Sequence, residues 1–547
     1  MGKERLYLFD TTLRDGAQTQ GVDFSVEDKR LIAGLLDKLG LDYVEGGYPG
    51  ANPTDTDFFS EDPGLKRATF TAFGMTKRAG RSADNDPGLA AIFDSTASAV
   101  CLVAKSWDFH VDVALGITNE ENLECISDSV RAIVARDREA MIDCEHFFDG
   151  YKANPDYAKA CVRAALDEGA RWAVLCDTNG GTLPHEVERI VAELTQEFPG
   201  DRLGIHCHND TENAVANSLA AVRAGVRQVQ GTLNGLGERC GNANMVSLIP
   251  TLMLKAEYAD RFEIGVDEKG LKDITHVSRT LDELLNRAPD RYAPYVGESA
   301  FASKAGIHVS AIMKNPATYE HVPPEKVGNK RHIAVSDQSG RANVYAQFET
   351  WEINYDPKDS RIDTFLYEIK ERENLGYSYD GAEASAELLA KRMLGQVPDY
   401  FTVNSFRVLV ERRYNALGEL VTVSEATVKV VVDDEQFISV GEGNGPINAL
   451  DEALRKDLGK YQSYIDEIRL VDFKVRILTG GTEAVTRVLI ESADAQGNRW
   501  FTVGVSPNIV DASFQALTDS ITYKLLRDGA PAPLAETAKP GLKKPGL

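Results

Sequence analysis

The residues best suited to chemistry are two histidines that flank one cysteine, His206-Cys207-His208. They follow a short apolar run, Arg202 to Ile205, which predicts a β-strand. Because alternate residues of a strand point to the same face, both imidazoles project toward one point while Cys207 points away. Two converging imidazoles suit a divalent metal ion, whereas a hydrogen-bonded pair of core histidines is the alternative without chemistry.

The strand that carries the histidines belongs to a series of short apolar runs in the first half of the chain. Helical patterns lie between most of them, and the one from Ser25 to Leu39 opens with a capping-box-like start. Eight such units predict an α/β fold with a catalytic (β/α)8 TIM barrel. A doubly wound open sheet is the alternative, but no Gly-x-Gly-x-x-Gly opens the first unit. The predicted strands are Leu6–Leu13, Tyr43–Tyr48, Ala68–Gly74, Ala99–Ala104, Met141–Phe148, Trp172–Asp177, Leu203–His208 and Val229–Leu233.

A barrel of this kind places its chemistry at the carboxyl ends of its strands. Asp15 follows the first predicted strand, which is separated from the seventh only by the eighth, so Asp15 can meet His206 and His208. Asn242, after the eighth strand, can add a weak oxygen ligand. Two histidines and one carboxylate leave coordination positions open, which indicates catalysis by Mg²⁺, Mn²⁺ or Zn²⁺.

The neighbours of this predicted site indicate its substrate. Arg14 can stabilise negative charge on the oxygen of a polarised carbonyl, and a salt bridge to Glu45 is its structural alternative. A 2-keto acid fits the site because its keto and carboxylate oxygens can chelate a metal, and Thr178 can hydrogen-bond the carboxylate. Glu145, across the mouth, can orient substrate or transfer a proton. Its structural alternative is an ion pair with Arg14 or Lys105.

Three motifs together resemble a known family. Phe9–Gly16, His206–Asp210 and Gly235–Ala243 resemble the signatures of the metal-dependent TIM barrels that include 2-isopropylmalate, homocitrate and citramalate synthases and hydroxymethylglutaryl-CoA lyase. A metal-dependent hydrolase barrel also uses His-x-His, but generally on the first strand, whereas here the pair is on the seventh.

The resemblance extends past the barrel. Ala305–Ser310 and Tyr319–Val322 resemble the linker subdomain of the synthases, in which a His and a Tyr reach over the barrel of the partner subunit. It implies that His308 and Tyr319 act with Glu145 on the methyl proton of acetyl-CoA and on the water that cleaves the thioester. The lyases generally lack this extension, so a lyase is disfavoured.

Two further stretches, Gly46–Asp55 and Cys176–Gly181, resemble one branch of the citramalate synthases. This resemblance implies a Claisen condensation of pyruvate with acetyl-CoA and water to give (R)-citramalate and CoA, in isoleucine biosynthesis. The alternative is a 2-isopropylmalate synthase that takes 2-ketoisovalerate in leucine biosynthesis. Discrimination depends on pocket volume, which the sequence does not reveal.

The C-terminal third carries an internal repeat. Glu425–Val432 echoes Glu483–Ile490, and Ala449–Leu454 echoes Ala512–Leu517, which predicts two βββα units in an α+β domain. The repeat resembles the regulatory domain of these synthases and implies a homodimer with feedback by an amino acid, isoleucine. A purely structural dimerisation module and a catalytically inactive amino-acid sensor are the alternatives.

These patterns predict four segments. The barrel spans residues 1–277, linker subdomains span 278–400 with a helix over 377–396, the regulatory domain spans 401–529, and a disordered tail spans 530–547.

Composition limits the partners of the chain. Its 547 residues carry a net charge of −24, which disfavours nucleic acid. No apolar run is long enough to cross a bilayer. Seven scattered cysteines without a C-x-x-C pair, and no signal peptide, predict a cytoplasmic protein.

Overall fold

The chain divides into two compact units. The computed structural model describes residues 2–414, 416–479 and 484–533. The first unit, called here the barrel unit, comprises Met1–Phe301 and His321–Arg331, and the second, the C-terminal unit, comprises Ala302–Glu320 and His332–Leu547. The predicted tail lies, from residue 534 onward, outside the described residues.

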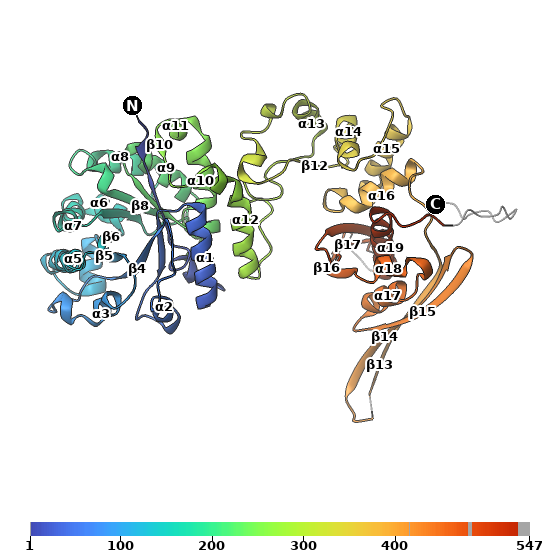
Figure 1. Cartoon of the computed structure of the whole chain (residues 1–547), viewed down its shortest axis with the longest axis horizontal. Coiled ribbons are helices and arrows are strands. Elements are labelled where there is room, and N and C mark those ends of the chain that lie inside the picture. Colours follow the sequence, from blue (N-terminus) through green and yellow to red (C-terminus); the bar gives the residue numbers. More distant parts are fainter. Residues whose placement is uncertain (1, 415, 480–483, 534–547) are drawn as a thin grey trace. The chain divides into compact units, whose positions relative to one another are not determined.

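The barrel unit is built on a closed barrel of eight parallel strands, which confirms the predicted (β/α)8 fold. Each strand pairs with the next in the chain, and the first pairs with the last. In Figure 1 the helices surround these strands. The strands are β2 (Tyr7–Asp10), β3 (Tyr43–Gly47), β4 (Thr69–Met75), β5 (Ala99–Lys105), β6 (Glu139–Glu145), β7 (Trp172–Asp177), β8 (Leu203–Cys207) and β9 (Gln228–Gly231).

Helices connect the strands and cover the barrel with their apolar faces. The helix α1 begins after Ser25, which forms the predicted capping box with Asp28. The longer helices of this unit are α1 (Val26–Leu39), α2 (Pro53–Phe58), α3 (Pro87–Phe93), α5 (Asn119–Val134), α6 (Phe147–Ala153), α7 (Pro155–Asp167), α8 (Pro184–Leu194), α9 (Ala214–Ala224), α10 (Met245–Leu254) and α12 (Glu268–Leu284). Two short strands, β1 (Glu4–Arg5) and β10 (Phe262–Glu263), precede and follow the barrel strands and pair in parallel with each other.

Five strands, β2, β3, β6, β8 and β9, end earlier than predicted, and three of these early ends contribute to the polar mouth of the barrel. After β2 the backbone turns, because the amides of Arg14, Asp15 and Gly16 all lie 2.9–3.2 Å from the carbonyl oxygen of Thr11. After β6, His146 adopts a left-handed conformation with φ of 57° and α6 begins. After β8, His208 pairs with Asn242 in an isolated bridge.

The C-terminal unit begins with helical linkers. Two short strands, β11 (Ala302–Ser303) and β12 (His332–Ile333), pair in parallel. The helices are α13 (Gly306–Ile312), α14 (Arg341–Thr350), α15 (Arg361–Asn374) and α16 (Glu383–Met393). The helix predicted over 377–396 was therefore wrong at its start, because Tyr379–Gly381 forms a separate 3-10 turn.

The predicted βββα repeat is confirmed in the rest of this unit. One antiparallel sheet joins β13 (Thr402–Tyr414), β14 (Leu420–Val432) and β15 (Glu435–Gly443), followed by α17 (Pro446–Arg455). The second joins β16 (Arg469–Ile477), β17 (Thr486–Ala493) and β18 (Arg499–Ser506), followed by α19 (Ile509–Arg527). Buried side chains of both sheets and both helices form one core, so the two repeats pack as a single body. Figure 1 shows the long β13–β14 hairpin.

Two further observations bear on the predictions from composition. All seven cysteines are free thiols, and only Cys240 is exposed. Among the residues that the structure describes, no helix has both the length and the apolar character needed to cross a membrane.

Candidate active site

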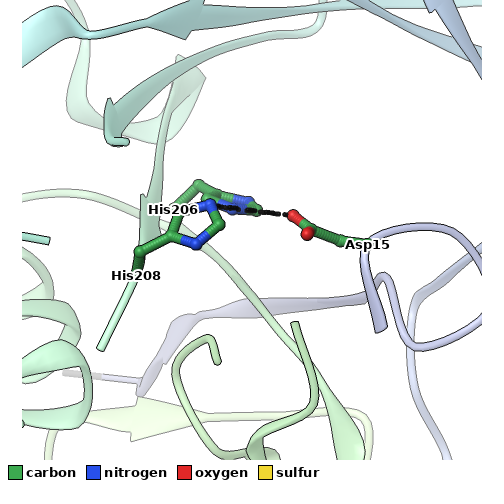
Figure 2. Close-up of side chains that lie close together, drawn as sticks. All are labelled: Asp15, His206 and His208. Atoms are coloured by element: carbon green, nitrogen blue, oxygen red, sulfur yellow. Dashed lines mark hydrogen bonds and ion pairs between the residues drawn. The ribbon is translucent and has the colours of Figure 1, made fainter. Parts of the chain in front are cut away.

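Asp15, His206 and His208 meet at the carboxyl ends of the barrel strands (Figure 2). Each offers one ligand atom, and these atoms lie within 4.8 Å of one another. The Nε2 atoms of the two histidines are 3.3 Å apart, and Asp15 Oδ2 lies 3.3 Å from His206 Nε2 and 3.9 Å from His208 Nε2. All three side chains are buried. The group therefore has the spacing of ligands around a single ion.

Barrel closure brings these residues together. His206 on β8 and His208, the residue that follows this strand, direct their imidazoles to one side, as the sequence predicts. The strand β9 lies between β8 and β2. Asn242 joins the group from the segment after β9, because its Nδ2 lies 3.0 Å from Asp15 Oδ2 and 3.3 Å from His206 Nε2.

The residues fit a divalent cation. Asp15 Oδ1, His208 Nδ1 and Asn242 Oδ1 are buried and have no hydrogen-bond partner among the residues that the structure describes. Unpaired buried polar atoms are costly in a folded protein and are normally satisfied by a protein group, water or an ion. Carboxylate, imidazole and amide oxygen donors suit Mg²⁺, Mn²⁺ or Zn²⁺, and they leave positions open for a substrate.

The three ligand groups influence one another's protonation. Burial disfavours a charge on Asp15, but Arg14 and the two histidines outweigh it and lower its pKa. The pKa of His206 is raised, because its contact with Asp15 outweighs burial. Burial and the neighbouring His206 lower the pKa of His208 to about 3. Asp15 is therefore charged and His208 neutral, the forms in which these two groups bind a metal ion.

Arg14 lies directly beside this group. Its Nη1 is 3.3 Å from Asp15 Oδ2 and its Nε donates to Glu45 Oε2 at 2.8 Å, so the structural alternative, a salt bridge to Glu45, is present alongside the contact with Asp15. The guanidinium also lies over the ring of Phe73, 4.0 Å from its centroid. Burial opposes the positive charge, but Glu45 and Asp15 outweigh it and raise the pKa of Arg14. The side chain is held as a fixed cation.

Thr178 and Glu145 lie at the ends of neighbouring strands, β7 and β6. The hydroxyl oxygen of Thr178 accepts the backbone N–H of His146 at 2.8 Å, which leaves its own proton available to a ligand. The carboxylate of Glu145 forms an ion pair with Lys105, one of the two structural alternatives for this residue. Both side chains are partly exposed, so a substrate in the mouth can reach them.

His308 and Tyr319 belong to the C-terminal unit. His308 lies on α13 and Tyr319 follows a short 3-10 turn, and both are exposed. Their ring centroids are 4.3 Å apart, so the two side chains form a local pair. Their role in catalysis stays a prediction that rests on their motifs.

Two buried residues next to the metal group were not predicted. Gln230 Oε1 lies 2.8 Å from His206 Nδ1, and Gln230 Nε2 donates to Asp143 Oδ1 at 3.0 Å. A signal was present in the sequence, because Gln228-Val229-Gln230 places two amides in a strand that otherwise reads as buried. Polar residues at interior positions of a barrel strand require partners, and this requirement points to the site.

The fold and the site together define a class. A parallel (β/α)8 barrel with a buried Asp-His-His group at the carboxyl ends of its strands has the arrangement of a metal-binding barrel protein. The HMGL-like family model matches residues 5–278. A model described as homocitrate synthase post-HMGL domain-like matches residues 295–375, and the LeuA allosteric (dimerisation) domain matches residues 380–525.

Curated relatives match nearly the whole chain. It is 48% identical to an (R)-citramalate synthase of Aquifex aeolicus, over 96% of this chain and 98% of the relative. It is 51% identical to one of Geobacter sulfurreducens, over 95% and 97%. A probable 2-isopropylmalate synthase of Methanopyrus kandleri is 30% identical over 95% and 98%. The chain belongs to the (R)-citramalate synthase family of HMGL-like barrels.

Proposed function

We propose that this protein condenses acetyl-CoA with pyruvate and water to give (R)-citramalate and CoA. The observation that carries the proposal is the buried group of Asp15, His206 and His208 with the cation Arg14 beside it. A bound divalent ion, Mg²⁺, Mn²⁺ or Zn²⁺, supplies a Lewis acid for the keto group. The residues that would hold it are Asp15, His206 and His208. Asn242 would add a fourth, weaker ligand through its oxygen after a turn of its amide, because its Nδ2 now faces Asp15.

The residues around this group bind and orient the keto acid. Thr178 donates its hydroxyl proton to the carboxylate of pyruvate, because its oxygen already accepts the amide of His146. Arg14 faces the keto oxygen and stabilises the negative charge that develops there when the new carbon–carbon bond forms. The contacts with Glu45 and Phe73 keep the guanidinium in place, so little reorganisation is needed during the reaction.

The remaining steps concern acetyl-CoA. His308 and Glu145 assist removal of a proton from its methyl group, and the resulting enolate attacks the keto carbon of pyruvate. Tyr319 acts with them on the water that then cleaves the thioester and releases CoA. The support for these roles is the match of their motifs, the pairing of His308 with Tyr319, and the position of Glu145 at the end of β6.

A thiol-release assay with a panel of 2-keto acids tests the proposal. We expect kcat/KM for pyruvate to exceed that for 2-ketoisovalerate by about a hundredfold, because a pocket shaped for a methyl group must exclude two further carbons. A higher value for 2-ketoisovalerate would identify a 2-isopropylmalate synthase instead. Absence of CoA release with every keto acid, in the presence of Mg²⁺ or Mn²⁺, would reject the synthase class.

The C-terminal domain gives the proposal a regulatory part. The protein acts as a homodimer in the cytoplasm, in isoleucine biosynthesis, and isoleucine binds residues 401–529 and inhibits turnover. The match of residues 380–525 to an allosteric (dimerisation) domain supports the dimer and the regulatory site, and the seven free cysteines support the cytoplasmic location.

The proposed domains follow this division of roles. Residues 1–277 form the catalytic domain, and 278–400 link it to the regulatory one. Light scattering measures the dimer, and the keto-acid assay repeated with isoleucine measures inhibition.

A further inference from the structure

The side-chain amide of Gln230 lies between His206 and Asp143 inside the barrel. The three residues come from β9, β8 and β6, and all are buried. Gln230 Oε1 is 2.8 Å from His206 Nδ1, and Gln230 Nε2 is 3.0 Å from Asp143 Oδ1. A continuous chain of hydrogen bonds therefore runs from Asp143 through Gln230 to His206.

This chain has a single direction. A carboxylate only accepts hydrogen bonds, so the NH₂ of Gln230 must face Asp143 and its carbonyl oxygen must face His206. A carbonyl oxygen also only accepts, so His206 Nδ1 must carry a hydrogen. In the neutral ring the lone pair then lies on Nε2, the atom that points toward Asp15 and His208.

We propose that Gln230 and Asp143 are positioning residues that hold His206 in the one tautomer able to bind the metal through Nε2. The inference rests on the proposed function, because it concerns the same metal site. Partners of this kind fix the ring of a metal-binding histidine and raise its basicity, and their loss typically lowers metal affinity 10- to 100-fold.

A second glutamine on the same strand separates this role from simple packing. Gln228 lies two residues earlier on β9, on the same face, and is equally buried. Within the described part of the chain, its Nε2 reaches only the sulfur of Met141, at 3.7 Å, and its Oε1 has no hydrogen-bond partner. Gln228 is thus a buried amide of the same strand that has no link to a histidine, and it provides a matched control for Gln230.

The test measures Mn²⁺ affinity of the full-length protein without substrates, from the electron paramagnetic resonance signal of free Mn²⁺. We expect Gln230→Met to weaken binding about 10- to 100-fold, and Gln228→Met to leave it within about twofold of wild type. Gln230→Glu restores an oxygen acceptor opposite His206 Nδ1, and its other oxygen can hydrogen-bond Asp143 only if it carries a proton. This variant is expected to bind Mn²⁺ more tightly than Gln230→Met. Asp143→Asn can donate as well as accept and no longer dictates the amide direction, so a smaller loss is expected.

Two results would overturn the proposal. Wild-type affinity in Gln230→Met would show that the amide does not position His206, and equal losses in both methionine variants would assign the effect to packing. Circular dichroism checks that each metal-free variant is folded, and if Gln230→Met is not, the order of Gln230→Glu and Asp143→Asn against Gln228→Met decides. Failure of the wild type to release CoA would reject the proposed function while the Mn²⁺ series still stands.

Discussion

Two buried aspartates in different units of the molecule have opposite surroundings. Asp494, in the turn between β17 and β18, accepts hydrogen bonds from the backbone and side chain of Asn498 and from Lys524 and Arg527 on α19. Both of its oxygens have several donors. Asp15 is as deeply buried, but its Oδ1 has no partner, and the neighbouring His208 and Asn242 also keep unpaired atoms.

This difference separates a structural acid from a ligand-binding one. A buried carboxylate whose lone pairs are all satisfied stabilises the segments that it joins, here a hairpin turn and a helix. One whose neighbours leave atoms unpaired is incomplete without a further partner. The type of residue is the same and both side chains are buried, so their neighbours and the number of satisfied atoms distinguish the two roles.

The largest effect that this comparison predicts is on turnover. We expect Asp15→Ala to lower kcat/KM by about a thousandfold or more, because loss of a Lewis acid removes several kcal/mol of transition-state stabilisation. Thiol release measures the loss. Isoleucine binding to the C-terminal domain, measured by calorimetry, is expected to stay unchanged. Retention of turnover would remove Asp15 from the site.

The counterpart substitution is expected to affect stability instead. Asp494→Asn removes the charge that faces Lys524 and Arg527, and we expect it to lower the stability of the C-terminal unit by about 1–3 kcal/mol. The cost is moderate because Lys524 keeps its ion pair with Asp528. Thermal unfolding followed by circular dichroism measures the change. At a temperature where the variant is folded, kcat/KM should match wild type, and a loss of turnover would contradict a purely structural role for Asp494.

A third substitution probes the unpaired atoms themselves. Asn242→Ala removes the amide that contacts Asp15 and the unpaired Oδ1, and we expect Mn²⁺ affinity to fall about tenfold. Electron paramagnetic resonance of free Mn²⁺ measures the constant. An unchanged affinity would exclude Asn242 from the ligand set and leave three protein ligands.

The smallest expected effect is on the pH dependence of stability. Burial opposes the charge of Asp494, but Asn498, Lys524 and Arg527 outweigh it and hold its pKa below the usual range. Since the folded pKa is lowered, the stabilisation is complete above the unfolded value of about 3.9 and is lost as the pH falls through the folded pKa. Between pH 5 and 3 we expect a loss of about 1 kcal/mol from this group. Unfolding of Asp494→Asn over the same range should lack that part of the slope.

The barrel and the C-terminal repeat could be predicted because each depends on a period in the sequence. The eight apolar runs and their helices specify the barrel, and the echo of Ala449–Leu454 in Ala512–Leu517 specifies the repeat. The His-x-His geometry also follows from strand alternation alone. Strand ends could not be predicted as well, because the turn after β2 depends on hydrogen bonds to Thr11 and not on hydrophobicity.

Contacts across the barrel interior could not be predicted from the sequence. Gln230, His206 and Asp143 meet because of the stagger between strands, which is set when the barrel closes. No local pattern encodes that stagger. Arg14 could be placed near the metal group from its neighbour Asp15, and its salt bridge to Glu45 was one of the alternatives, whereas its contact with Phe73 could not be predicted.

The metal group combines residues from both ends of the barrel segment, and this has a consequence for the folding of the newly synthesised chain. Asn242 and Asp15 are 227 residues apart, and β2 and β9 are the first and last strands of the barrel. Before β9 and the segment after it are synthesised, the nascent chain holds at most part of the ligand set. An ion that binds the complete set therefore stabilises only the closed barrel. It favours the folding step in which the first and last strands of the barrel pair.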